Sequence, residues 1–128
     1  MTTYVVLLPG DEAAWEQAPA EQRAAVYERH TEFARVLAER GHTVTGGAEL
    51  AHSRTARTLR AGRDGLVVTD GPYAEAVEQL TGFYLVESDD ADDLLDVCRI
   101  LAGSDSILGD AKGAIEVRAV VGGEEGDA

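Results

Sequence analysis

The chain has 128 residues, 45% of them hydrophobic and only three of them proline, so we expect one globular domain and not a disordered chain. Its 11 Lys and Arg stand against 24 Asp and Glu, and the formal net charge of -13 excludes nucleic acid and anionic membrane surfaces as expected partners. No apolar run is long enough to cross a bilayer and no basic leader precedes the first apolar run, so we expect a cytoplasmic protein.

The first third of the chain predicts a strand followed by a long helix. Residues 4–8 are a continuous run of strand-forming side chains, and Pro9 interrupts it. After a loop-like stretch, apolar side chains and one histidine recur at helical spacing: Val26, His30, Phe33 and Leu37. Because His30 lies in the middle of this stripe, we expect it to face the sheet, either as a core histidine with one hydrogen bond or as a functional group.

The middle of the chain predicts a strand and then a hairpin. Residues 43–50 begin as a strand, and two consecutive glycines at 46 and 47 indicate a bulge. Residues 55–60 and 65–69 have the pattern of two short strands joined through an Asp-Gly turn. The second of these strands leads directly to Asp70, which we expect at the end of a strand in the sheet that the helix with His30 covers.

The turn after that strand collects polar and aromatic groups at a strand end, where rigid scaffolds often hold functional side chains. The candidates for catalysis or binding in this turn are Asp70, Gly71, Pro72, Tyr73, Glu75 and Glu78. A turn that only connects two elements and has no functional role explains the same residues, because Asp-Gly and Gly-Pro are common turn dipeptides.

The last third predicts a strand, a helix, a loop and a final strand. Residues 82–87 are strongly apolar, and the acids that follow suit the N-terminus of a helix. That helix has an apolar stripe formed by Leu94, Leu95, Cys98 and Leu101. Cys98 is the only cysteine, and its place in the stripe predicts a buried, inert thiol. Residues 104–113 are predicted to be a loop and residues 114–121 a strand.

The order of these elements is β-α-β-(β-β)-β-α-β, which predicts a ferredoxin-like α+β fold with an antiparallel sheet and an extra hairpin. We expect a single domain over residues 1–121 and an acidic disordered tail over residues 122–128. Two helices cover only one face of such a sheet, and residues 4–8 and 83–86 are apolar on both alternating sets. A homodimer in which a second copy covers the other face is therefore expected.

Five stretches together carry a family resemblance. They are residues 70–75 (Asp-Gly-Pro-Tyr-Ala-Glu), residues 78–84, the helix with His30 and Phe33, residues 46–50, and residues 116–118 (Glu-Val-Arg). With them the chain resembles the YCII-related family, in its branch named for an Asp-Gly-Pro-Phe motif, from residue 4 to residue 120. This resemblance implies a dimeric α+β barrel built from ferredoxin-like protomers.

The resemblance also implies a His-Asp pair in a cleft as an acid-base centre, and here the pair would be His30 and Asp70. The resemblance implies Phe, Thr and Lys at the positions where this chain has Tyr73, Ala76 and Val77. This chain therefore lacks a hydroxyl and a cation before Glu78 and has an additional phenol. A carboxylate within hydrogen-bond reach would favour the imidazolium and raise the pKa of His30, unless burial outweighs the charge.

Three functions remain open on these residues. The first is a cofactor-free enzyme that performs elimination, isomerisation or hydrolysis on a small cyclic or carbonyl compound, with His30 as base, Asp70 orienting it, and Tyr73 or Glu78 near the substrate. No metal is expected, because the histidines show no metal-binding spacing. The second is a non-catalytic binding or regulatory dimer, which the resemblance links to extracytoplasmic-function sigma factors. The third is a dimer whose cleft has lost its activity.

Overall fold

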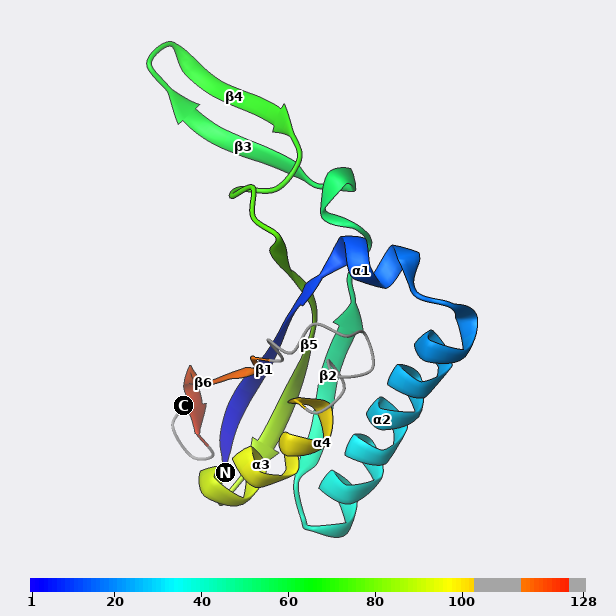
Figure 1. The fold of residues 1–128 in the computed structure, drawn as a ribbon. Coiled ribbons are helices and arrows are strands. Elements are labelled where there is room, and N and C mark those ends of the chain that lie inside the picture. Colours follow the sequence, from blue (N-terminus) through cyan, green and yellow to red (C-terminus); the bar gives the residue numbers. More distant parts are fainter. Residues whose placement is uncertain (103–113, 125–128) are drawn as a thin grey trace.

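The computed structural model describes residues 1–102 and 114–124, and its centre is a four-stranded antiparallel sheet (Figure 1). The strands are β1 (Thr2–Asp11), β2 (Thr43–Glu49), β5 (Glu78–Ser88) and β6 (Glu116–Glu124), in the order β2-β5-β1-β6. The predicted mixed α+β fold with an antiparallel sheet is confirmed, and the strand order is consistent with a ferredoxin-like arrangement. β6 continues to Glu124, past the predicted strand end at residue 121. The loop predicted at residues 104–113 lies outside the described residues.

One face of the sheet is covered by α2 (Ala20–Glu39), α3 (Ala91–Val97) and α4 (Arg99–Ala102). The predicted long helix is confirmed as α2, which gives way at Arg40 to Gly41 with a φ of +86°. The second predicted helix is divided at Cys98 into α3 and α4. The side chains fully enclosed between helices and sheet are Val6, Phe33, Leu37, Val86 and Leu94.

Cys98 belongs to this core, where its side chain is 3% exposed. Burial raises the pKa of the thiol to about 11, so the thiol stays protonated at neutral pH. The predicted burial of Cys98 is therefore confirmed.

A short helix that the sequence pattern did not predict, α1 (Glu12–Gln17), follows β1 directly. Asp11 caps it, because its carboxylate accepts a hydrogen bond of 3.1 Å from the backbone N–H of Ala14. This helix turns the chain away from the sheet end and toward the start of α2.

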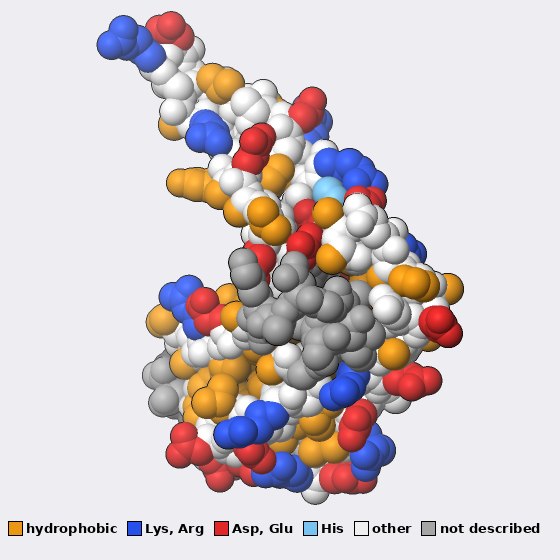
Figure 2. Space-filling model, viewed as in Figure 1, with side chains coloured by type: hydrophobic (Ala, Val, Ile, Leu, Met, Phe, Trp, Pro, Cys, Tyr) orange, Lys and Arg blue, Asp and Glu red, His pale blue; other side chains and the backbone are white. Residues whose placement is uncertain are grey.

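The predicted hairpin is present as β3 (Arg57–Gly62) and β4 (Gly65–Asp70), but these strands form a separate two-stranded sheet. The hairpin projects from the body of the molecule, and hydrophobic side chains are visible along it in Figure 2. Leu59 pairs with Val68 on one face, and their side chains are 60% and 52% exposed. The expectation that Asp70 ends a strand of the helix-covered sheet was therefore wrong.

The second face of the main sheet carries an apolar row that no described helix covers. The register pairs Val5 with Leu85 and Leu7 with Phe83, whereas the neighbouring Val6 and Val86 point into the helix-covered core. All four side chains of the row are partly exposed.

Among the described residues, no helix combines the length and the apolar character that a bilayer crossing needs.

His42 links the end of α2 to the start of α3. Its side chain is 3% exposed, with Nδ1 2.8 Å from Ser88 Oγ and Nε2 2.7 Å from a carboxylate oxygen of Asp93. Arg40 donates to the same carboxylate, and the pKa of Asp93 is lowered first by the hydrogen bond from His42 and then by that from Arg40. The network satisfies every polar atom of a buried imidazole, so we assign it a structural role.

Candidate functional site

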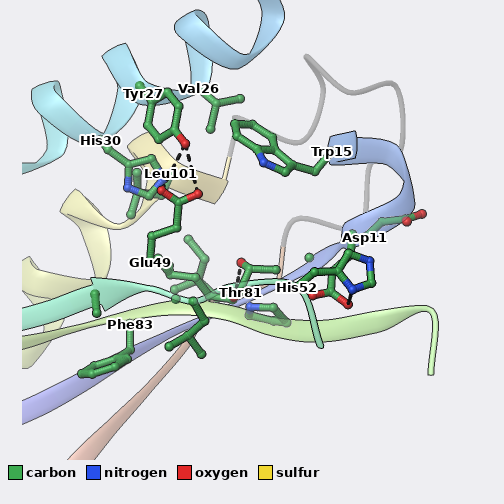
Figure 3. Close-up of a pocket in the computed structure, with 18 of the residues that line it drawn as sticks. Asp11, Trp15, Val26, Tyr27, His30, Glu49, His52, Thr81, Phe83 and Leu101 are labelled. Atoms are coloured by element: carbon green, nitrogen blue, oxygen red, sulfur yellow. Dashed lines mark hydrogen bonds and ion pairs between the residues drawn. The ribbon is translucent and has the colours of Figure 1, made fainter. Parts of the chain in front are cut away.

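A cavity with a volume of about 720 Å³ lies between α1, α2 and the ends of β1, β2 and β5 (Figure 3). This volume is in the range of small-molecule sites. Apolar and aromatic side chains form most of its wall, among them Leu8, Trp15, Val26, Tyr27 and Tyr84. We call this cavity the main cleft.

His30 reaches the main cleft from the middle of α2, as its position in the helical stripe predicts. Its Nδ1 lies 2.7 Å from the hydroxyl oxygen of Tyr84, on β5, and the two rings stack with centroids 5.8 Å apart. Burial lowers the pKa of His30 below its ordinary value, and the charge of Glu49 opposes this shift. The imidazole is therefore neutral at physiological pH and can accept a proton.

Glu49 ends β2 and points into the main cleft between His30 and Tyr27. The Tyr27 hydroxyl lies 3.1 and 3.0 Å from the two carboxylate oxygens. The pKa of Tyr27 is raised, first by burial and then by this hydrogen bond. Glu49 was not predicted as a site residue, and the only signal in the sequence is its place shortly after the two glycines of a predicted bulge.

Trp15 forms the outer wall of the main cleft from α1. Its ring meets that of Tyr27 edge to face, with centroids 5.5 Å apart. Arg23 holds α1 in place, because its Nε donates to the Trp15 carbonyl oxygen at 3.2 Å and its Nη2 to that of Glu16 at 2.7 Å. The guanidinium also lies 5.6 Å from the centre of the Trp15 ring.

A polar rim closes the end of the main cleft nearest the hairpin. Both carboxylate oxygens of Glu12 bond to Ser53, through its hydroxyl and its backbone N–H. His52 lies with Nε2 3.3 Å from Glu16, whose carboxylate also pairs with Arg54 at 2.9 Å. The hydrogen bond from Arg54 is the main cause that lowers the pKa of Glu16.

The predicted turn residues do not join His30 in the main cleft. Asp70, Gly71, Pro72 and Glu75 line a separate, shallow cavity at the base of the hairpin. The side chain of Asp70 is 92% exposed, and its carboxylate lies 3.8 Å from Arg57 Nε. Because the hairpin is a sheet of its own, this chain does not bring Asp70 together with His30.

The two other predicted binding residues line neither cavity. Tyr73 is 76% exposed, with the guanidinium of Arg60 5.6 Å from its ring centre. Glu78 is exposed at the start of β5, opposite Asp11 in the register. Glycine at position 71 is explained by its φ of +103°, and its backbone N–H donates to the Ala56 carbonyl oxygen at 2.6 Å.

The arrangement suits proton transfer in a largely apolar site. It offers a neutral imidazole, two phenols and a carboxylate, all within one cleft. Burial raises the pKa of Tyr84, so its hydroxyl keeps its proton and serves as a hydrogen-bond donor or acceptor. Within the described part of the chain, no group of three or more His, Cys, Asp or Glu side chains has the geometry to hold a metal ion.

Comparison with known proteins gives a consistent result. Residues 2–121 match the model of the YCII-related domain. Over 115 residues the chain is 33% identical to the uncharacterized protein R00369 of Rhizobium meliloti (strain 1021), an alignment that covers 90% of this chain and 89% of that protein.

Proposed function

The chain belongs to the YCII-related family, and on this premise we propose that it is a small-molecule enzyme whose acid-base residue is His30. The reaction class is lyase, isomerase or hydrolase chemistry on a small cyclic or carbonyl compound bound in the main cleft. The observation that carries the proposal is the 2.7 Å contact between His30 Nδ1 and the Tyr84 hydroxyl inside a cavity of ligand size. We also propose membership of the Asp-Gly-Pro-Phe branch, on the basis of residues 70–75.

His30 serves as the general base in this proposal. When its Nδ1–H donates to the Tyr84 oxygen, the lone pair of Nε2 is free to take a proton from the substrate. The resulting imidazolium keeps the same hydrogen bond, and the carboxylate of Glu49 stabilises its charge. Tyr84 is thus a positioning residue that holds the ring and its tautomer.

A homodimer is part of the same proposal. The apolar row formed by Val5, Leu7, Phe83 and Leu85 has no cover among the described residues, and a second copy presenting the same row would bury it. Such face-to-face packing of two sheets gives the dimeric α+β barrel that the family resemblance implies.

Hydrogen–deuterium exchange into candidate substrates tests the enzyme directly. A panel of ring ketones and lactones, with their amino-substituted analogues, is incubated with the protein in D₂O, and proton NMR follows the signals of the acidic C–H groups. For at least one compound, we expect exchange with the parent to be about 10²- to 10⁴-fold faster than with His30→Gln. Tyr84→Phe should retain part of the rate, because the base is present but less well oriented.

Asp70→Asn is the matched control for the same assay. Since Asp70 lies outside the main cleft, the variant should exchange as fast as the parent. A rate reduced to that of His30→Gln would mean that Asp70 reaches the site from a second copy. If no compound exchanges faster, and no lactone is hydrolysed faster, with the parent than with His30→Gln, the acid-base proposal fails and a binding or regulatory dimer, including one that acts with a sigma factor, becomes the better explanation.

A further inference from the structure

Among the described residues of the main cleft, none is a cationic partner of the Glu49 carboxylate. Its two oxygens accept from the Tyr27 hydroxyl, and no ion pair joins it to a Lys or Arg within the described part of the chain. Glu49 is also exposed, so the carboxylate is accessible to a molecule that enters the cleft. A carboxylate with one neutral hydrogen-bond donor keeps its full negative charge available to a ligand.

The other charged groups of the wall are already engaged. Asp11 caps α1, Glu12 bonds to Ser53, and Glu16 pairs with Arg54. Arg23 is the one arginine among the described residues of the wall, and it donates to two backbone carbonyl oxygens. Among the described residues, four acids therefore line the cleft against one arginine, and the electrostatic field that they produce favours cations over anions.

Aromatic rings lie beside this carboxylate. Tyr27 donates to Glu49 and also contacts the ring of Trp15 edge to face, while Tyr84 stacks on the ring of His30. The combination of aromatic faces and a carboxylate is the chemistry that proteins use to bind organic ammonium groups. A neutral His30 adds no positive charge that would oppose such a ligand.

We propose that the main cleft binds a small organic ammonium compound, with the ammonium group at Glu49 and the apolar part against Trp15 and Tyr27. This names the substrate class of the site in which the enzyme function is proposed, and it rests on that proposal for its biological meaning. Anionic compounds of the same shape are disfavoured, because they would meet Glu49 with like charge.

Binding of three matched compounds tests the proposal at pH 7 on the full chain. These are 2-phenylethylamine, which is a cation, 2-phenylethanol, which is neutral, and 3-phenylpropionate, which is an anion. Trp15 is the only tryptophan and lines the cleft, so its fluorescence reports binding at this site. We expect the amine to bind about tenfold more tightly than the alcohol and more tightly still than the carboxylate.

Two variants test whether the carboxylate of Glu49 causes the preference for the amine over the alcohol. Glu49→Gln can still accept a hydrogen bond from Tyr27, so it should fold normally and bind amine and alcohol with equal affinity. Glu75→Gln removes a carboxylate from the other cavity and should leave the preference unchanged. The proposal is overturned if the parent binds the alcohol or the anion as tightly as the amine or more tightly. It is also overturned if Glu49→Gln still prefers the amine over the alcohol, or if the amine does not bind the parent at millimolar concentration.

The binding assay and the exchange assay can each refute one proposal without refuting the other. Loss of deuterium exchange in every compound, with the amine preference intact, removes the enzyme function but leaves the ligand class. Exchange that depends on His30, without any amine preference, leaves the enzyme and removes the ligand class.

Discussion

Gly47→Ala should destabilise the protein strongly, because this residue allows β2 to approach β5 beneath the main cleft. Gly47 lies opposite Tyr84 in the register and has a φ of +147°, a conformation that residues with a Cβ rarely adopt. A Cβ at this position would lie 2.5 Å from the Phe83 carbonyl oxygen and 3.1 Å from the Cα of Tyr84. Real Cβ contacts essentially never fall below 3.0 Å, so one of the two backbones has to move.

The cost has two parts. Backbone strain at such a φ contributes about 1–3 kcal/mol, and forcing extra volume into a packed strand pair contributes about 1–3 kcal/mol more. A total of about 4 kcal/mol is a large share of the roughly 5–15 kcal/mol by which domains of this kind are stable. With a urea m-value of about 1.5 kcal/mol/M, the unfolding midpoint should fall by about 2–3 M.

Gly65→Ala separates the two parts. Gly65 has a φ of +126°, but a Cβ there meets nothing within 4 Å, so only strain applies and about 1–2 kcal/mol should be lost. Urea unfolding of parent and variants, followed by circular dichroism at one protein concentration, measures the difference. If Gly47→Ala costs no more than Gly65→Ala, the close approach of β2 and β5 does not constrain this position and the argument is refuted.

Two further predictions concern pH and assembly. The pKa of Asp93 is lowered in the folded state by His42 and Arg40, so its contribution to stability is present above the unfolded pKa of about 3.9 and is lost as the pH falls through the folded value. Asp93→Asn should therefore lower the melting temperature at pH 7, and this loss should shrink as the pH falls below about 3.9, whereas the exposed Asp64→Asn should change the melting temperature little at any of these pH values. A loss that stays constant from pH 7 down to pH 2 would contradict the linkage. Light scattering should give twice the chain mass of 13.6 kDa, and Leu85→Arg on the uncovered sheet face should shift it toward the monomer; a monomeric parent at micromolar concentration would exclude the dimer.

The elements that depend on a long repeating pattern could be predicted from the sequence. The position of His30 on the inner side of α2 follows from a stripe of apolar residues that continues for several turns, and the structure confirms it. The hairpin strands could also be predicted, but pattern alone does not say whether a hairpin joins the main sheet. This is why Asp70 was wrongly expected on the sheet that the helix with His30 covers.

Two features of the candidate site depend on local geometry that a residue pattern does not contain. Glu49 faces the cleft after a register shift between Val44 and Gly46, and a single-residue shift reverses which side chains face the helices. The helix α1 is six residues long and is held by the Asp11 cap and by contacts from Arg23, which lies on another helix. Contacts between separate elements, α1 with α2 and β2 with β5, therefore determine the wall of the cleft.

The base of the hairpin has a consequence for how this protein can vary. The N–H of Gly71 donates to the carbonyl oxygen of Ala56, so the chain leaves the body and returns to it at two adjacent points. The projection between them shares no ladder hydrogen bonds with the main sheet. Residues 57–70 thus form an exchangeable module: insertions, deletions or grafted sequences there can alter what the projection contacts, while α2, β2 and β5, which hold His30, Glu49 and Tyr84, keep their places.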